Sequence, residues 1–143
     1  MCFVFVGPQT RQSEAVFGSL KDKRVHQLGE IALAAETAAY AGCELFCMPS
    51  TQESFGGVYA EAWAFGKPVI GGRVFAITCV IDDGKDGFLC SQDPGELAEK
   101  ICYLIEHPEL ATAMGEAGRR KVQERLTWAQ LAETTLNVYK DLL

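Results

Sequence analysis

Short apolar runs alternate with longer segments of helical spacing along this chain, and this alternation limits its fold more than any other feature. The clearest example is an apolar run at Leu45–Met48, a polar loop, a helical segment at Val58–Phe65, and a further apolar run at Pro68–Gly71. Short apolar runs bounded by Gly and Pro are typical of buried strands. Strands that alternate with helices predict an α/β fold, in which a parallel sheet of about four to five strands is covered by helices on both faces.

The same pattern extends to both ends of the chain. Further strands are predicted at Cys2–Val6, Val25–Leu28 and Phe88–Cys90, and further helices at Ser13–Leu20, Ile31–Ala41, Glu109–Arg125 and from Thr127 through Leu142. The run Asp93-Pro94-Gly95-Glu96 predicts another helix start, with an N-cap aspartate and a proline in the first turn.

Four positions and one segment carry more specific expectations. Thr127 and Gln130 have the spacing of a capping box, and Trp128 directly after the cap is expected to bury its ring. Gly42 is expected to end its helix in a left-handed conformation. The segment Arg73–Cys79 is expected to be a loop.

Composition limits the class of protein. The 143 residues, 48% apolar and 22% charged, are ordinary for one soluble domain with a real core. The net charge is −6 and no basic cluster exceeds Arg119-Arg120-Lys121, which argues against a nucleic-acid partner. No apolar run approaches the ~20 residues that span a bilayer, and the start of the chain lacks a signal-peptide pattern, so we expect a cytoplasmic protein without a transmembrane segment. The six cysteines form no CxxC pair and are expected to be free thiols in hydrophobic segments, without a metal site.

Two carboxylates bracket a Gly-Gly turn after the Leu45–Met48 run. Glu53 precedes the turn and Glu61 lies in the following helix, while the amides of Phe55–Val58 lie between them. Amides at a helix start bind phosphate, and carboxylates accept hydrogen bonds from hydroxyls, so this layout suits a sugar nucleotide. The same spacing recurs at Glu36/Glu44 and Glu116/Glu124. Glu36 and Glu44 flank a helix without such a loop, whereas here the Gly-Gly loop follows a predicted strand, beyond whose carboxyl end ligands of open α/β sheets bind.

The residues around these carboxylates resemble a known signature. Pro49-Ser50, Glu53-Ser54-Phe55-Gly56, Glu61-Ala62 and Gly66-Lys67-Pro68-Val69-Ile70 are similar to the donor-site signature of the retaining "glycosyl transferases group 1" family. Members of that family transfer a sugar from a nucleotide diphosphate donor. They have the GT-B fold, in which two Rossmann-like domains face a cleft and the signature lies in the C-terminal domain. The likeness extends from about Val25 to the end of the chain.

The resemblance implies a role for each site residue. Glu61 would accept both ribose hydroxyls, and Glu53 would contact the donor sugar near its anomeric carbon as the catalytic residue. Gly29 and Glu30 would hold the nucleotide base. The backbone amides of four residues would bind the sugar and the diphosphate: Phe55, Gly56, Gly57 and Val58. The nucleotide-diphospho-sugar is a substrate, so no cofactor and no obligatory metal are implied.

Part of the family pattern has no counterpart here. Family members carry an Arg and a Lys that neutralise the diphosphate, and no pair of that context is found in this sequence. We therefore expect residues 1–143 to form a single donor-binding domain that lacks the acceptor domain and its own first strand and loop. Leaving-group stabilisation is a large catalytic effect, so this chain alone is expected to be inactive. Its exposed surface is expected to favour homo-oligomers.

Two alternatives of other classes remain open. The chain could be a non-catalytic module that binds nucleotides or assembles with itself, or part of a sugar-nucleotide epimerase of the GT-B fold. A dehydrogenase is disfavoured, because Gly7-Pro8-Gln9-Thr10 after the first strand is not the GxGxxG of a dinucleotide site.

Overall fold

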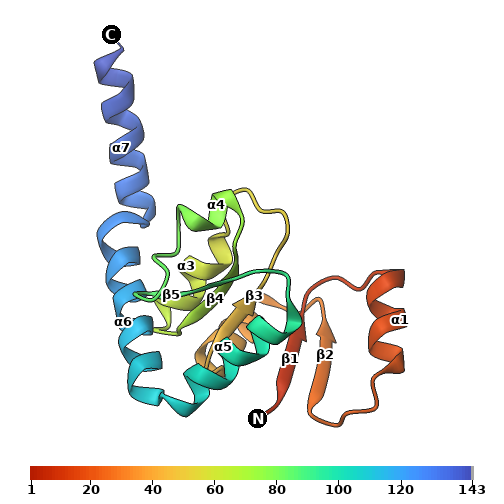
Figure 1. Cartoon of the computed structure of the whole chain (residues 1–143). Coiled ribbons are helices and arrows are strands. Elements are labelled where there is room, and N and C mark those ends of the chain that lie inside the picture. The colour runs from red at the N-terminus through yellow and green to blue at the C-terminus, as the bar shows by residue number, and fades with distance from the viewer. Residues whose placement is uncertain (143) are drawn as a thin grey trace. The chain divides into compact units, whose positions relative to one another are not determined.

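A computed structural model of the chain describes residues 1–142. Helices and strands alternate in the predicted order, and every predicted element is present within two residues of its expected bounds. The described residues group into two compact units, residues 1–39 and the chain from Tyr40 onward (Figure 1). The assignment of both units to one domain stays a prediction.

The first unit is a strand-helix-strand segment. Strands β1 (Phe3–Val6) and β2 (Val25–Gly29) pair in parallel, and helix α1 (Arg11–Ser19) connects them. Thr10 caps α1, because its hydroxyl accepts a hydrogen bond from the backbone amide of Ser13 at 3.1 Å. Helix α2 (Leu33–Gly42) follows and ends in the second unit.

The second unit contains a parallel sheet of three strands. They are β3 (Phe46–Met48), β4 (Val69–Gly72) and β5 (Gly87–Cys90), in the order β3-β4-β5, so β4 is central. Phe46 pairs with Val69, and Val69 pairs in turn with Gly87. This register aligns the carboxyl ends of the three strands at one edge of the sheet.

Helices cover both faces of this sheet. Successive side chains of β4 point to opposite faces, so each face has its own core. Val69 packs on one face with helix α3 (Gly57–Ala64), whereas Ile70 packs on the other face with α5 (Pro94–Glu106). Asp93 caps α5 as predicted, since its carboxylate accepts from the Glu96 amide at 2.8 Å. The first face buries seven residues: Tyr59, Ala62, Trp63, Val69, Ile77, Ile81 and Leu89.

Helix α6 (Pro108–Arg125) contacts both α3 and α5. Two glycines allow it to approach the α3 region closely. A Cβ atom added to Gly115 would lie closer than 3.0 Å to the backbone of Gly66, and one added to Gly118 would lie closer than 3.0 Å to the ring of Trp63. These glycines are therefore part of the packing between α6 and α3.

Helix α7 (Trp128–Asp141) follows α6 and projects from it (Figure 1). The predicted capping box is confirmed, because the Thr127 hydroxyl accepts from the Gln130 amide while the Gln130 side chain accepts from the Thr127 amide. The prediction for Trp128 is wrong, since its ring is 88% exposed. A cap fixes where a helix begins, but burial requires a neighbouring element.

Three other expectations are corrected. Gly42 does not adopt a left-handed conformation, because α2 continues through it and the Cys43 thiol donates to the carbonyl oxygen of Tyr40 at 3.3 Å. The expected loop at residues 73–79 contains the short helix α4 (Phe75–Thr78). Three of the six cysteines are exposed rather than packed in apolar segments: Cys2, Cys79 and Cys102.

Candidate functional site

The candidate site lies at the carboxyl edge of the three-stranded sheet, where the loop Pro49–Gly56 connects β3 to α3. The loop is held at its base by two hydrogen bonds. The buried hydroxyl of Tyr59 donates to the Met48 carbonyl at 2.6 Å, and the Gln92 side chain donates to the Pro49 carbonyl at 3.1 Å. Gly72 lies so close to the Ser50 carbonyl that a Cβ atom there would overlap it. The start of the loop is therefore fixed by α3, by the end of β4 and by Gln92 after β5.

Gly56 turns the chain from the loop into the helix. It is the N-cap residue of α3 and has φ 74° and ψ 48°, a left-handed conformation that favours glycine. An added Cβ atom would also lie 2.7 Å from Ile77 Cδ1 and from the Tyr59 ring. Both backbone conformation and space therefore require glycine at this position.

The amides of four consecutive residues, Phe55–Val58, donate no hydrogen bond to any acceptor among residues 1–142. No side chain caps α3, and a Cβ atom at Gly57 would meet nothing within 4 Å. Unpaired amides at a helix start carry partial positive charge. This segment can therefore bind an anion that approaches the backbone directly.

The two carboxylates flank these amides along the chain. Glu61 is exposed on α3, and its Oε2 accepts a hydrogen bond from the Tyr40 hydroxyl at 2.8 Å. Glu53 is half-buried, and its Oε1 accepts from the Ser54 amide at 3.2 Å. Burial raises the pKa of Tyr59, and the charge of nearby Glu53 adds to that rise. Both carboxylates thus belong to the loop-and-helix segment that carries the unpaired amides.

Gly29 and Glu30 lie at and just after the end of β2 in the first unit. Gly29 has φ 69° and, as in the prediction, ends a strand. Its backbone carbonyl accepts from the Gly7 amide at 2.9 Å. Their assignment to the nucleotide base stays a prediction.

Sequence reasoning missed a buried ionic network behind α3. Asp86 is 1% exposed, and the ammonium of Lys121 contacts its Oδ2 while also lying 3.0 Å from Asp82 Oδ2. The Trp63 indole donates to the Asp86 carbonyl at 2.8 Å, and the Lys121 Nζ lies 5.1 Å from the centre of the Trp63 ring. Burial raises the pKa of Asp86 and the Lys121 ammonium opposes that rise. No short-range pattern in the sequence links residues 63, 86 and 121.

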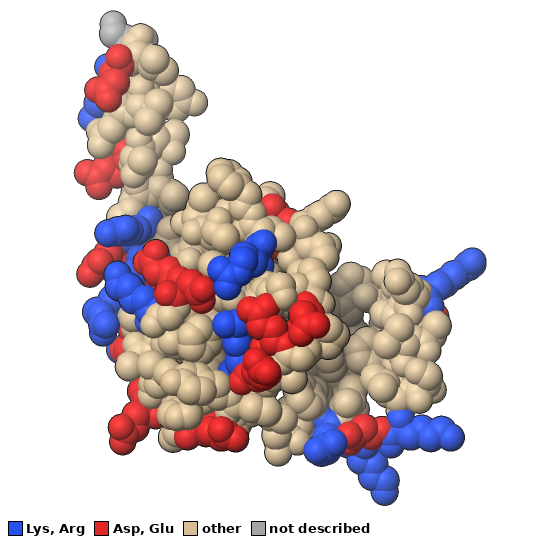
Figure 2. Space-filling model, in the orientation of Figure 1, with Lys and Arg blue, Asp and Glu red and all other residues tan. Residues whose placement is uncertain are grey.

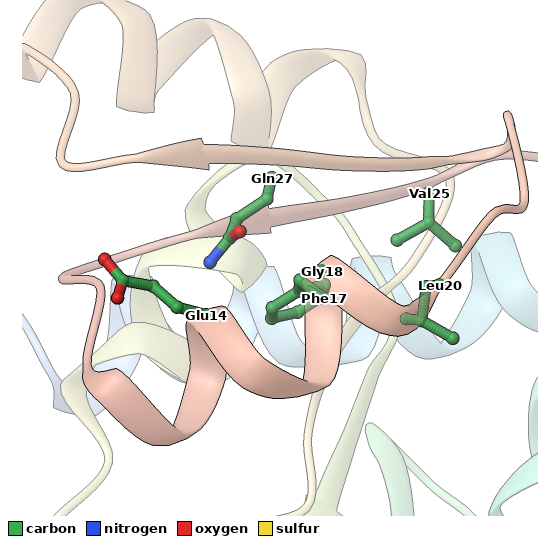
Figure 3. Close-up of a pocket in the computed structure, with 6 residues that line it drawn as sticks. All are labelled: Glu14, Phe17, Gly18, Leu20, Val25 and Gln27. Atoms are coloured by element: carbon green, nitrogen blue, oxygen red, sulfur yellow. The ribbon is translucent and has the colours of Figure 1, made fainter.

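The charge distribution on the visible face and the pocket of the first unit give no further indication of the donor site. Acidic and basic side chains are interspersed on the visible face rather than gathered in one large patch of a single sign (Figure 2). A pocket in the first unit lies between α1 and β2, where the Gln27 side chain points toward the helix (Figure 3). It is lined by none of the predicted donor-site residues.

Neither a metal centre nor a membrane-spanning helix is found among residues 1–142. No group of three or more His, Cys, Asp and Glu side chains is placed to hold a metal ion in this part of the chain. None of its helices combines the length and the apolar character needed to cross a membrane.

Comparison with known proteins gives consistent matches. The sequence profile described as "Glycosyl transferases group 1" matches residues 1–107. N-acetyl-alpha-D-glucosaminyl L-malate synthase of Bacillus anthracis is 36% identical over 123 residues, which cover 85% of this chain and 32% of that protein. Alpha-maltose-1-phosphate synthase of Mycobacterium tuberculosis is 32% identical over an alignment that covers 96% of this chain and 35% of that protein. The chain spans between 22 and 35% of the length of the curated relatives it matches.

Solved structures support the same assignment of fold. Sucrose-phosphate synthase from Thermosynechococcus elongatus has a TM-score of 0.86 and 27% identity, over 97% of this chain and 38% of that chain. HepE of Anabaena, solved in complex with UDP-glucose, has a TM-score of 0.83 and 23% identity, over 98% of this chain and 41% of its own. The predicted fold class is confirmed: parallel strands and helices are arranged as in the C-terminal Rossmann-like domain of GT-B structures. The expected single sheet of about four to five strands is corrected, because the strands pair as β1-β2 and as β3-β4-β5.

Proposed function

This chain belongs to the glycosyl transferases group 1 family, and on that premise we propose that it is the donor-binding part of a glycosyltransferase. The substrate class is a nucleotide-diphospho-sugar, whose sugar is transferred to an acceptor with retention of configuration. The observation that carries the proposal is the run of four unpaired amides, Phe55–Val58, between two carboxylates at the carboxyl edge of a parallel sheet. Sites of open α/β folds lie at that edge.

Each group has a proposed task. The diphosphate lies against the amides of the loop and of the first turn of α3, where partial positive charge stabilises an anion. Glu61 accepts hydrogen bonds from the ribose hydroxyls. Glu53 contacts hydroxyls of the donor sugar and orients the anomeric carbon. Gly29 and Glu30 contact the base through backbone groups.

The proposed transfer takes place on one face of the sugar. The bond from the anomeric carbon to the diphosphate oxygen breaks as the acceptor oxygen approaches from the same side, and the departing phosphate takes the acceptor proton. The loop amides stabilise the negative charge that develops on the leaving oxygen, an effect for which one donor is worth about 2.7 to 4 kcal/mol. No metal is required for these steps.

The 143-residue chain by itself is proposed to bind the donor without turning it over. The resemblance places an Arg and a Lys against the diphosphate, and four basic residues of the first unit have no matching sequence context: Arg11, Lys21, Lys23 and Arg24. Without such cations the barrier to loss of the leaving group stays high.

A thermal-shift titration tests the binding step. UDP, GDP, ADP and their sugar conjugates are each added to the native chain and to Glu61→Ala. Glu124→Ala, which removes an exposed glutamate from α6, is the control of equal charge. A ligand at about ten times its Kd stabilises the folded state by about 1.4 kcal/mol, which raises Tm by about 5 °C in a chain of this size.

A shift with one nucleotide that persists in Glu124→Ala and disappears in Glu61→Ala is the expected result, and it identifies the base. A cooperative melt that no nucleotide shifts would contradict the proposed donor site. An equal shift in all three proteins would place the nucleotide elsewhere.

A further inference from the structure

Among the described residues 1–142, Tyr40 is the one residue outside the loop Pro49–Gly56 and helix α3 whose side chain hydrogen-bonds to Glu53 or Glu61. It lies on α2, and its hydroxyl donates to Glu61 Oε2 at 2.8 Å across a separation of 21 residues. A bond to a charged carboxylate is among the stronger hydrogen bonds of a protein. The contact therefore restrains a glutamate that is otherwise exposed on the surface of α3.

The Tyr40 ring is itself held by packing. It stacks on Phe65 with ring centres 6.2 Å apart and planes inclined by 8°, and it lies 5.6 Å from Phe46. Phe46 in turn makes an edge contact with Tyr59, whose hydroxyl anchors the base of the Pro49–Gly56 loop. We call Tyr40, Phe46, Tyr59 and Phe65 the aromatic cluster. The cluster fixes the ring from which the hydroxyl reaches Glu61.

The position of the hydroxyl matters because of what the proposed function asks of Glu61. To accept both ribose hydroxyls, the carboxylate must present its two oxygens in a defined plane. An exposed glutamate side chain populates several rotamers, and ordering it on binding costs conformational entropy. The Tyr40 hydrogen bond uses one lone pair of Oε2 and leaves the second lone pair of Oε2 and both of Oε1 available.

We infer that Tyr40 is a positioning residue. It pre-orients Glu61, so that the site binds ligands with ribose hydroxyls more tightly than ligands that lack them. This inference rests on the proposed function. Tyr40 acts through Glu61 and is not assigned a contact with the ligand. Its contribution is therefore selective: it strengthens binding only of ligands that carry the hydroxyls.

The test compares two ligand series by isothermal titration calorimetry. The first is UDP, GDP and ADP, and the second is their 2′,3′-dideoxy analogues, which lack both ribose hydroxyls. The proteins are the native chain, Tyr40→Phe, Glu61→Ala and the double variant. Tyr103→Phe is the matched control, because it removes a tyrosine hydroxyl from α5 and leaves Glu61 untouched. Tyr40→Phe keeps the aromatic contacts, and thermal melts verify that each variant is folded.

The expected result is that Tyr40→Phe weakens binding of the ribonucleotide by about three- to tenfold, the size of one hydrogen bond, and leaves the dideoxy analogue unchanged. In the Glu61→Ala background the same substitution should have no further effect, since the group it positions is gone. Tyr103→Phe should match the native chain with both ligands.

Three results would overturn the inference. If Tyr40→Phe binds the ribonucleotide like the native chain, or weakens both ligands equally, the hydroxyl does not position Glu61 for ribose, and the donor site stands. If the substitution remains additive with Glu61→Ala, Tyr40 acts by another route. If the native chain binds none of the nucleotides, the proposed function fails and the inference fails with it.

Discussion

Replacement of Gly118 by alanine should destabilise the second unit, although alanine is the better helix former. The added Cβ atom would lie closer than 3.0 Å to the Trp63 ring, whereas carbon atoms pack best at about 3.5 to 4.0 Å. The ring cannot move aside, because Trp63 is fully buried, its indole donates to the Asp86 carbonyl at 2.8 Å and the Lys121 ammonium lies over it. Helix α6 must therefore shift away from α3.

The magnitude follows from two opposing effects. Overpacking of a rigid core costs up to about 3 kcal/mol, and the change from glycine to alanine inside a helix returns about 1 kcal/mol. The net loss is about 2 kcal/mol in the free energy of unfolding. In urea this lowers the midpoint by about 1 M, which can be followed by far-ultraviolet circular dichroism and tryptophan fluorescence.

Gly42→Ala is the matched control. Gly42 lies inside α2 with a helical backbone, and a Cβ atom there would meet nothing within 4 Å. The substitution should be neutral or stabilise the protein by up to about 1 kcal/mol. A Gly118→Ala variant as stable as native, or one that gains stability as Gly42→Ala does, would refute the close packing between α6 and α3.

Three further predictions concern charge, reactivity and capping. Lys121→Met should lower the free energy of unfolding by about 3 to 5 kcal/mol at pH 7, because it leaves the buried Asp86 carboxylate without its ionic partner. Burial raises the pKa of Asp86 in the folded state, so protonation of Asp86 favours folding. The loss of stability, measured by urea titration, should therefore be smaller at pH 4.5 than at pH 7. Equal losses at both pH values would contradict this. Burial raises the pKa of Cys47 to about 12, whereas Cys79 is exposed. Mass spectrometry after alkylation at pH 8 should therefore find Cys79 modified long before Cys47. Equal rates of alkylation at the two thiols would contradict the burial of Cys47. Thr127→Ala should cost about 1 kcal/mol of helix stability and lower the helical circular dichroism signal, whereas Thr127→Ser, which can keep the cap, should not.

The sequence predicted best those features that depend on neighbouring residues. The caps at Asp93 and Thr127 are hydrogen bonds between residues three apart, so their pattern is visible in the chain itself. The prediction that Gly42 adopts a left-handed conformation was wrong for a related reason. Whether a helix ends in a left-handed glycine depends on which group satisfies the last carbonyls, and here the Cys43 thiol donates to one of them.

Features that join distant segments were not predicted. The Tyr40 hydroxyl meets Glu61, and Lys121 meets Asp86, across separations that no local periodicity encodes. Exposure of Trp128 likewise depends on which element lies beside α7. One usable signal was overlooked: Gly115 and Gly118, three residues apart on a helix, share a face, and small residues on one face are typical of close helix packing.

Glycine can be required at a position either because the fold leaves no room for a side chain or because a ligand approaches the backbone. Gly56, Gly57 and Gly72 allow these two requirements to be measured separately. Substitution at Gly56 or Gly72 would force atoms together, so a saturation library sorted for folded protein should already reject other residues there. Gly57 has free space around it and an ordinary backbone conformation, so the same sort should accept alanine. If a second sort for nucleotide capture then rejects alanine at Gly57, the difference in tolerance between the two sorts records how closely a ligand approaches the main chain.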